Sequence, residues 1–119
     1  MAFPHCSNIV GEINPAAEVC ALAREAGAAT VVDGVALAPH GLPDLGEVGA
    51  DVYLFSTYKT FGPHLGVMVV SPELAMSLGN QGHFFNADLP GKRLTPAGPD
   101  HAQVAAVAGG AQYLDAFDL

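Results

Sequence analysis

The chain has 119 residues, half of them hydrophobic, so it is long enough for one domain with a single hydrophobic core. Its 12 acidic residues outnumber its 4 basic ones, and no basic cluster offsets the formal net charge of -8. A chain with this charge repels phosphate backbones and anionic lipid surfaces, so we expect neither nucleic acid nor a membrane as a partner.

The amino-terminal stretch MAFPHCSNIVGE lacks the basic and apolar regions of a signal peptide, and the longest apolar runs are far too short to cross a bilayer. These features predict an intracellular, cytoplasmic protein. Cys6 and Cys20 have neither the spacing of a metal site nor the density of a disulfide scaffold, so we expect two reduced, structural thiols.

The first periodic segment is NPAAEVCALAREAGA, which predicts a helix over residues 15–26. Pro15 suits the first helical turn, apolar residues follow at helical spacing, and Gly27 stands where a C-cap falls. The run ATVVDG then predicts a short, buried strand that ends at Asp33.

The next segments alternate between loop and strand signals. The Pro- and Gly-rich stretch APHGLPDLGEVGA predicts a loop, and the runs DVYLFS and LGVMVV predict two further strands on either side of a polar turn around Lys59. From Ser71, SPELAMSL predicts a short helix. Residues 79–98 read as a loop, and PDHAQVAAVAGGAQYLDAF resumes helical periodicity as far as Phe117.

This order of elements favours an α/β fold with a mostly parallel sheet and helices packed on it, in which ligands bind at the carboxyl ends of strands. Asp33 and residues 56–59 are expected at those ends. A sheet of three or four strands with helices from one part of the unit leaves an open edge and exposed apolar faces, so we expect further chain around it.

Two residues at the strand ends, Asp33 and Lys59, indicate the chemistry of the site. Alone, Asp33 resembles a solvated or capping acid, and Lys59, one of only two lysines with Lys92, resembles a surface amine. Together they match what pyridoxal 5'-phosphate (PLP) requires: an amine that forms a Schiff base with the aldehyde and an acid that keeps the pyridine nitrogen protonated. Ser56 and Tyr58 would then donate hydrogen bonds to the phosphate.

A resemblance to a known family rests on four motifs: HCSNIVGEINP, VVDGVALAPH, GADVYLFSTYKTFGPHLGV and LTPAGPDHAQVAAVAGGAQYL. The chain resembles part of the large domain of class V aminotransferase-type enzymes, the PLP-dependent fold type I group that includes the cysteine desulfurases. Family chains are about three times as long, as is usual for multidomain enzymes. We therefore expect residues 1–119 to form a partial PLP-binding large domain, without the family's N-terminal part and C-terminal small domain.

The resemblance also implies roles for individual residues. Lys59 corresponds to the lysine that carries the cofactor and shuttles a proton, and Asp33 to the partner of the pyridine nitrogen. The remaining matches are Val35 on one ring face, Ser56 and Tyr58 at the phosphate, and Asn8 near the phenolic oxygen of the cofactor or the carboxylate of the substrate.

Three positions differ from the desulfurase pattern. Ala36 replaces a glutamine, Tyr58 replaces a histidine, and Gly98 stands where a threonine of the neighbouring subunit reaches the phosphate. With YKTFGPHLGV and the GPDH segment, these changes resemble the desulfurase-like subfamily more than true desulfurases. The resemblance implies an amino-acid substrate and a homodimer with its active site at the subunit interface, and it gives Cys6 and Cys20 no persulfide role.

Other interpretations are weaker or different in kind. The main alternative is a truncated, catalytically inactive fragment that keeps only the scaffold; a Rossmann-type nucleotide module ranks last, because no GxGxxG follows a strand. The GKRL stretch reads as a solvated loop. The histidines show no paired ligand spacing, so we expect no metal and interpret them as hydrogen-bonded structural residues: His5, His40, His64, His83 and His101.

Overall fold

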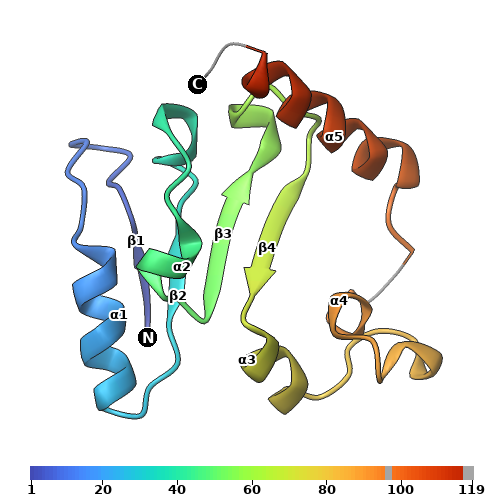
Figure 1. Ribbon diagram of the computed structural model, residues 1–119, viewed down its shortest axis with the longest axis horizontal. Helices are drawn as coiled ribbons and strands as arrows, with labels where there is room; N and C mark the ends of the chain where they lie inside the picture. The colour runs from blue at the N-terminus through green and yellow to red at the C-terminus, as the bar shows by residue number, and fades with distance from the viewer. Residues whose placement is uncertain (96–97, 117–119) are drawn as a thin grey trace.

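The computed structural model describes residues 1–95 and 98–116, which contain one sheet with the strand order β1-β2-β3-β4 (Figure 1). Strands β1, β2 and β3 run parallel, and β4 pairs with β3 in the antiparallel direction. The mixed, mostly parallel sheet confirms the predicted fold class. The strands are β1 (Ala2–Pro4), β2 (Val31–Asp33), β3 (Val52–Ser56) and β4 (Gly66–Val70).

The helices agree with the predicted periodic segments and add short turns to the predicted loops. The predicted helices over residues 15–26 and from Ser71 are confirmed within about one residue at each end. Phe117, the last residue of the third predicted helix, lies outside the described residues. The helices are α1 (Ala16–Glu25), α2 (Leu45–Val48), α3 (Pro72–Ser77), α4 (Pro90–Arg93) and α5 (His101–Asp115), with 3₁₀ turns at Ala38–His40, Thr57–Lys59 and Phe84–Asn86.

Two predicted loops therefore need correction. The Pro- and Gly-rich stretch after β2 contains α2, whose first turn is capped by Asp44 through hydrogen bonds from the amides of Gly46 and Glu47. The GKRL stretch, predicted as a loop, supplies most of α4, with Lys92 and Arg93 in its last turn. Both helices span a single turn, so their sequences are too short to show helical periodicity.

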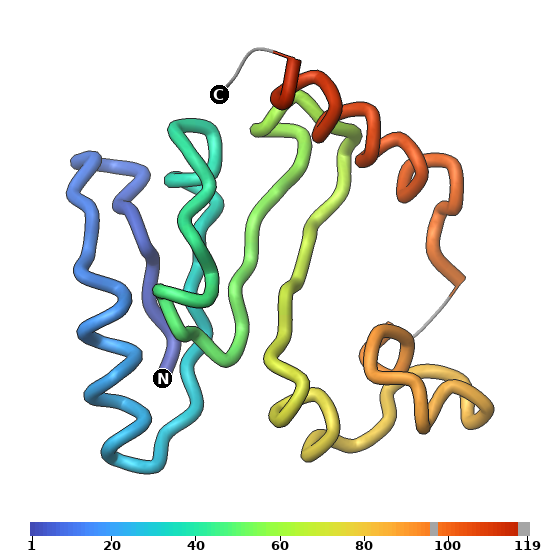
Figure 2. Tube along the Cα trace, viewed as in Figure 1, coloured from blue at the N-terminus to red at the C-terminus, as the bar shows by residue number. Residues whose placement is uncertain are grey.

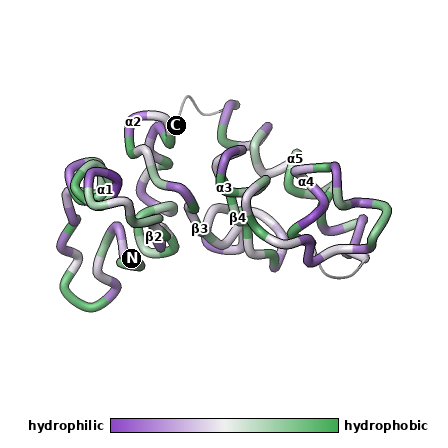
Figure 3. The backbone as a smooth tube through the Cα atoms, turned by 90° about the horizontal axis from the view of Figure 1, so that it is seen from below, coloured by the Kyte–Doolittle hydropathy of each residue, from purple (hydrophilic) through white to green (hydrophobic). Residues whose placement is uncertain are grey.

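The hydrophobic core lies on one face of the sheet, beneath α1 and α2. In Figure 3 both helices lie on the same side of β2. The core side chains come from these helices and from the strand residues that point toward them, namely Ala16, Cys20, Val32, Val48 and Tyr53. Cys6 and Cys20 are both buried and unpaired, as expected for structural thiols.

A polar link fixes the starts of β2 and β3. Asp51 Oδ2 accepts hydrogen bonds from the Thr30 amide at 2.7 Å and from its hydroxyl at 3.0 Å, and the Asp51 amide donates to Thr30 Oγ1 at 3.1 Å. Thr30 is only 1% exposed, so its polar atoms need these partners. The link sets the register of the two strands and thereby the relative position of their carboxyl ends.

Apolar side chains are exposed on β4, the antiparallel edge strand, and in the segment that follows it. Met68 and Val69 of β4 are 50% and 41% exposed, and Phe84 is 86% exposed. No residue of α5 is buried among the described residues. The chain extends over 43 × 40 × 24 Å, and Figure 2 shows it along the shortest of these three axes. The structure thus shows the exposed apolar surface that the sequence predicts. Within the described ranges, no helix has the length and apolar character needed to span a membrane.

Candidate functional site

The carboxyl ends of β1, β2 and β3 lie at the same edge of the sheet, and the predicted site residues follow from them (Figure 1). Asp33 ends β2 and pairs with Leu54 of β3. Ser56 ends β3, about 7 Å further along the strand, because each strand residue rises about 3.3 Å. Lys59 ends the 3₁₀ turn that follows at once.

Asp33 is exposed, and its carboxylate makes one local bond. Oδ1 accepts a hydrogen bond from the Val35 amide at 2.9 Å, which turns the chain sharply after β2. The Asp33 carbonyl accepts from the His5 amide at 2.8 Å. Among the described residues no hydrogen bond reaches Oδ2, so half of the carboxylate is available to a ligand.

The turn that carries Lys59 is organised by Thr57. The buried Thr57 hydroxyl lies 2.5 Å from the Pro63 carbonyl and 3.2 Å from the Leu65 carbonyl, and its amide donates to the Leu65 carbonyl at 2.9 Å. A Cβ on Gly62 would stand 2.9 Å from the Thr57 Cβ, so the returning chain needs a glycine there. These contacts fix the turn while the Lys59 side chain stays exposed.

The two hydroxyl residues that flank this turn differ in their surroundings. Ser56 is half-buried at the end of β3, whereas Tyr58 is 47% exposed. The Tyr58 ring stacks on the His64 ring, with centroids 4.5 Å apart and planes inclined by 6°. This stacking holds the Tyr58 side chain beside the turn that carries Lys59.

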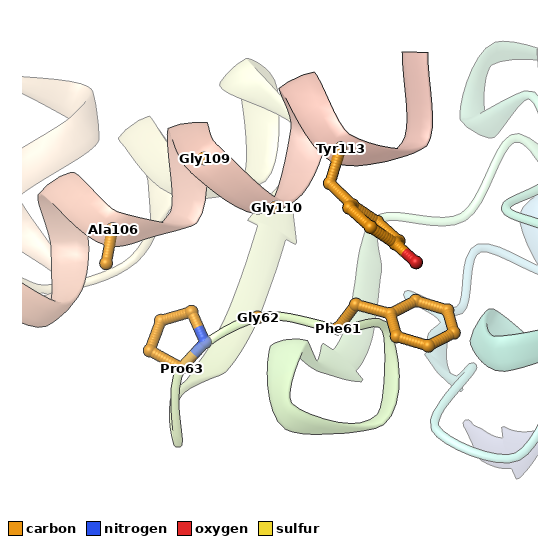
Figure 4. A pocket seen from close by; sticks show the side chains of 7 residues that line it. All are labelled: Phe61, Gly62, Pro63, Ala106, Gly109, Gly110 and Tyr113. Carbon is orange, nitrogen blue, oxygen red and sulfur yellow. The ribbon is translucent and has the colours of Figure 1, made fainter. Parts of the chain in front are cut away.

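Helix α5 packs across the turn after Lys59, in a contact that sequence reasoning did not predict (Figure 4). Phe61 has a φ of 63°, which is strained for a residue with a side chain, and its ring packs on Tyr113 at a centroid distance of 5.4 Å. A Cβ on Gly110 would lie 3.6 Å from Gly62 Cα, which is an ordinary van der Waals distance, so α5 lies against the backbone of this turn.

Asn8 and Gly98 belong to other segments than the turn that carries Lys59. Asn8 is exposed in the turn after β1, where the Ser7 hydroxyl accepts from the amides of Ile9 and Val10. No hydrogen bond joins the Asn8 side chain to another described residue. Gly98 is exposed in the segment before α5, and a Cβ there would meet nothing within 4 Å.

His5 and Tyr53 form a buried polar pair next to the end of β2. The sequence predicts a structural role for His5 but does not identify Tyr53 as its partner. His5 Nδ1 and the Tyr53 hydroxyl are 2.9 Å apart, and the residues are 8% and 2% exposed. Burial lowers the pKa of His5, and burial together with the negative charge of Asp33 raises the pKa of Tyr53. His5 is thus the hydrogen-bonded structural histidine that the sequence predicts, but nothing local pointed to Tyr53.

These pKa shifts predict how stability depends on pH. A folded pKa of His5 below its usual 6.5 means that the unfolded chain binds more protons, so the free energy of unfolding falls as pH drops below about 6.5. A folded pKa of Tyr53 above 10.0 means that the folded chain binds more protons, so stability also falls as pH rises above about 10. Urea unfolding across this range measures both limbs.

Two substitutions separate the limbs. Tyr53→Phe removes the phenol and should flatten the alkaline limb, whereas His5→Asn removes the imidazole and should flatten the acid limb. Limbs that persist unchanged in both variants would show that other groups cause them. The parts of the chain that the structure describes contain no group of three or more His, Cys, Asp or Glu side chains placed to hold a metal ion.

The family model for aminotransferase class-V matches residues 1–85. The chain belongs to the class-V aminotransferase family. Among curated relatives, the aminotransferase-like protein FGM3 of Gibberella zeae is 46% identical over 89 residues, which are 74% of this chain and 22% of FGM3. Probable cysteine desulfurase 2 of Mycobacterium leprae is 34% identical over 131 residues, covering 100% of this chain and 31% of the relative.

Solved structures confirm the fold of this class-V aminotransferase chain. The cysteine desulfurase CsdA from Escherichia coli superposes with a TM-score of 0.80 at 26% identity, over 96% of this chain and 32% of CsdA. Pyridoxamine-pyruvate aminotransferase from Mesorhizobium loti has the same coverage, with a TM-score of 0.71 at 21% identity, and shows the fold alone. The fold is that of fold type I PLP enzymes. The chain spans 32% of each of these two solved chains and 22% of FGM3.

Proposed function

We propose that this chain belongs to a PLP-dependent enzyme that acts on an amino acid, with the cofactor held between Asp33 and Lys59. Enzymes of this family depend on PLP. The observation that supports the proposal most directly is the placement of Asp33, with a carboxylate oxygen free of described partners, beside the strand whose terminal turn carries Lys59. A carboxylate, an amine and nearby hydroxyls are the donor set that fits PLP.

Each residue then has a defined task. Asp33 would accept a hydrogen bond from the pyridine nitrogen of the cofactor. The Lys59 amine would hold the cofactor by condensing with its aldehyde, with loss of water, and would be placed to accept and return the proton at the α-carbon of the substrate. Bound PLP supplies the electron sink that makes this carbon acidic. Ser56 and Tyr58 would donate to the phosphate, Val35 would pack on the ring, and Asn8 would orient the phenolic oxygen or the substrate carboxylate.

The state of the whole protein follows the family resemblance. We propose that residues 1–119 form the cofactor-binding part of a large domain, that the complete enzyme has further domains, and that it works as a cytoplasmic homodimer. The alternative, an inactive scaffold, is favoured by one observation: Asp33 and Lys59 are both exposed, and no described segment shields them from water. On this view the chain binds PLP weakly and turns over no substrate.

Reductive labelling tests the cofactor assignment. The chain is mixed with PLP, reduced with borohydride, digested and examined by mass spectrometry for a pyridoxyl group. Because it has only two lysines, we expect the label on Lys59, its loss in Lys59→Arg, and its retention in the matched control Lys92→Arg. A label confined to Lys92 or the amino terminus would contradict the assignment, and labelled chain without turnover of any amino acid would support the scaffold alternative.

A further inference from the structure

We propose that His5 and Tyr53 form a positioning pair that fixes the carboxyl end of β2 and presents the Asp33 carboxylate without neutralising its charge. This inference rests on the proposed function, in which Asp33 is the acid that faces the cofactor. Neither residue of the pair is among the proposed cofactor contacts, and both are nearly inaccessible to solvent, at 8% and 2% exposed. Their role is therefore exerted through Asp33.

His5 contacts two neighbouring strands at once. Its amide donates to the Asp33 carbonyl at 2.8 Å, which secures the main chain at the end of β2. Its ring Nδ1 lies 2.9 Å from the hydroxyl of Tyr53, which belongs to β3 and pairs with Val32. The carboxyl end of β2 is thus held by the His5 main chain on the β1 side and by the Tyr53 side chain on the β3 side.

The Tyr53 ring packs closely against Gly34. The Gly34 amide donates to the Leu54 carbonyl at 2.7 Å, which extends the β2–β3 pairing past Asp33. A Cβ on Gly34 would stand 2.2 Å from the Tyr53 ring, so that ring occupies the space a side chain would take. Because the ring fills the space beside the residue after Asp33, the Asp33 backbone and the ring cannot shift independently.

The His5–Tyr53 pair carries no charge near neutral pH. Burial lowers the pKa of His5, and burial and the Asp33 charge raise the pKa of Tyr53, so both groups are neutral near pH 7. The hydrogen bond between the Tyr53 hydroxyl and His5 Nδ1 therefore joins two neutral groups, whichever of them donates. The charged groups that line the hollow at His5 are all acidic: Glu18 of α1, Asp44 and Glu47.

A neutral pair has a specific advantage over a basic partner. A lysine or arginine in contact with Asp33 would fix the carboxylate equally well, but it would also compensate the negative charge. No described cation is bonded to Asp33, and its position is set by neutral hydrogen bonds and packing instead. The charge therefore stays available to a cationic ligand group such as a protonated pyridine.

The test compares three variants of the full chain, first without cofactor. Tyr53→Phe and His5→Leu remove the hydrogen bond, whereas His5→Asn keeps an amide that can donate or accept near the position of Nδ1. We expect hydrogen-exchange protection of the residue 5 and Gly34 amides to fall about fivefold in the first two and to be restored in His5→Asn, because one neutral bond is lost. His83→Asn, at a histidine stacked on Phe85, is the matched control and should change neither amide.

The outcomes separate positioning from simple stabilisation. Equal loss of protection at the Asp51 amide, which lies at the opposite ends of the strands, would show that the pair only stabilises the fold and would overturn the proposal. Unchanged protection in Tyr53→Phe, the variant least apt to disturb folding, would overturn it as well. With PLP, we expect affinity about fivefold lower in Tyr53→Phe and unchanged fixation on Lys59.

The two proposals fail in different ways. If Lys59 of the unaltered chain takes no pyridoxyl label, the proposed function fails, and the exchange measurements still decide whether the pair positions Asp33. If Lys59 is labelled but Tyr53→Phe and His5→Leu bind PLP as tightly as the unaltered chain, the positioning role is wrong and the proposed function stands.

Discussion

Replacing Asp33 with asparagine is expected to weaken PLP binding by about tenfold to a hundredfold, because a hydrogen bond to a charged group contributes about 1.5–3 kcal/mol. Asparagine keeps an oxygen at the position of Oδ1, so the hydrogen bond from the Val35 amide and the turn after β2 are retained. The substitution therefore removes the charge and little else. An absorbance titration of the chain with PLP at constant pH measures the effect.

A second acid provides the control for this experiment. Asp44 also accepts backbone hydrogen bonds through Oδ1, from the amides of Gly46 and Glu47 at the start of α2. Asp44→Asn makes the same change of net charge and preserves the same kind of acceptor, so PLP affinity should be unaltered. Equal affinity of Asp33→Asn and the unaltered chain would remove Asp33 from the site.

Replacing Gly34 with alanine is expected to destabilise the fold by about 3 kcal/mol, at the upper end of the usual range for overpacking. The added Cβ would stand 2.2 Å from the Tyr53 ring, and this ring is 2% exposed and hydrogen bonded to His5, so it has no free space to enter. Urea unfolding of the variant measures the loss.

The cause can be tested by shrinking the neighbour. In a Tyr53→Leu background, Gly34→Ala should cost less than about 1 kcal/mol, since the clashing ring atoms are gone. Gly66→Ala in β4 is the matched control: a Cβ there meets nothing within 4 Å, so stability should stay the same or rise slightly. A full cost in the Tyr53→Leu background would show that the clash is not the cause.

The sequence predicted the elements that carry strong local signals. Helix α1 has an apolar periodicity, and β2 and β3 consist of β-branched and aromatic runs, so all three were found. Strand β1 was not predicted, because it has three residues, ends in Pro4 and shows no buried residue. Its place in the sheet comes from pairing with β2, which is a long-range interaction.

The residues of the candidate site were likewise predicted only in part. Asp33 and Lys59 were expected at the carboxyl ends of neighbouring strands, and the structure places them there. Their roles, and those of Val35, Ser56, Tyr58 and Asn8, stay predictions. The His5–Tyr53 pair was missed because 48 positions separate its members along the chain, and no spacing rule reports contact over such a separation.

The hydrogen bonds of Thr57 have a consequence for the energetics of ligand binding. They fix the backbone of the turn that carries Lys59 when the chain folds, so the entropy of ordering that loop is lost before any ligand arrives. Binding then has to immobilise only the lysine side chain, at a cost of about 1–2 kcal/mol rather than that of several backbone residues. For the proposed function, this preordered turn lowers the entropic cost of attaching a cofactor to Lys59.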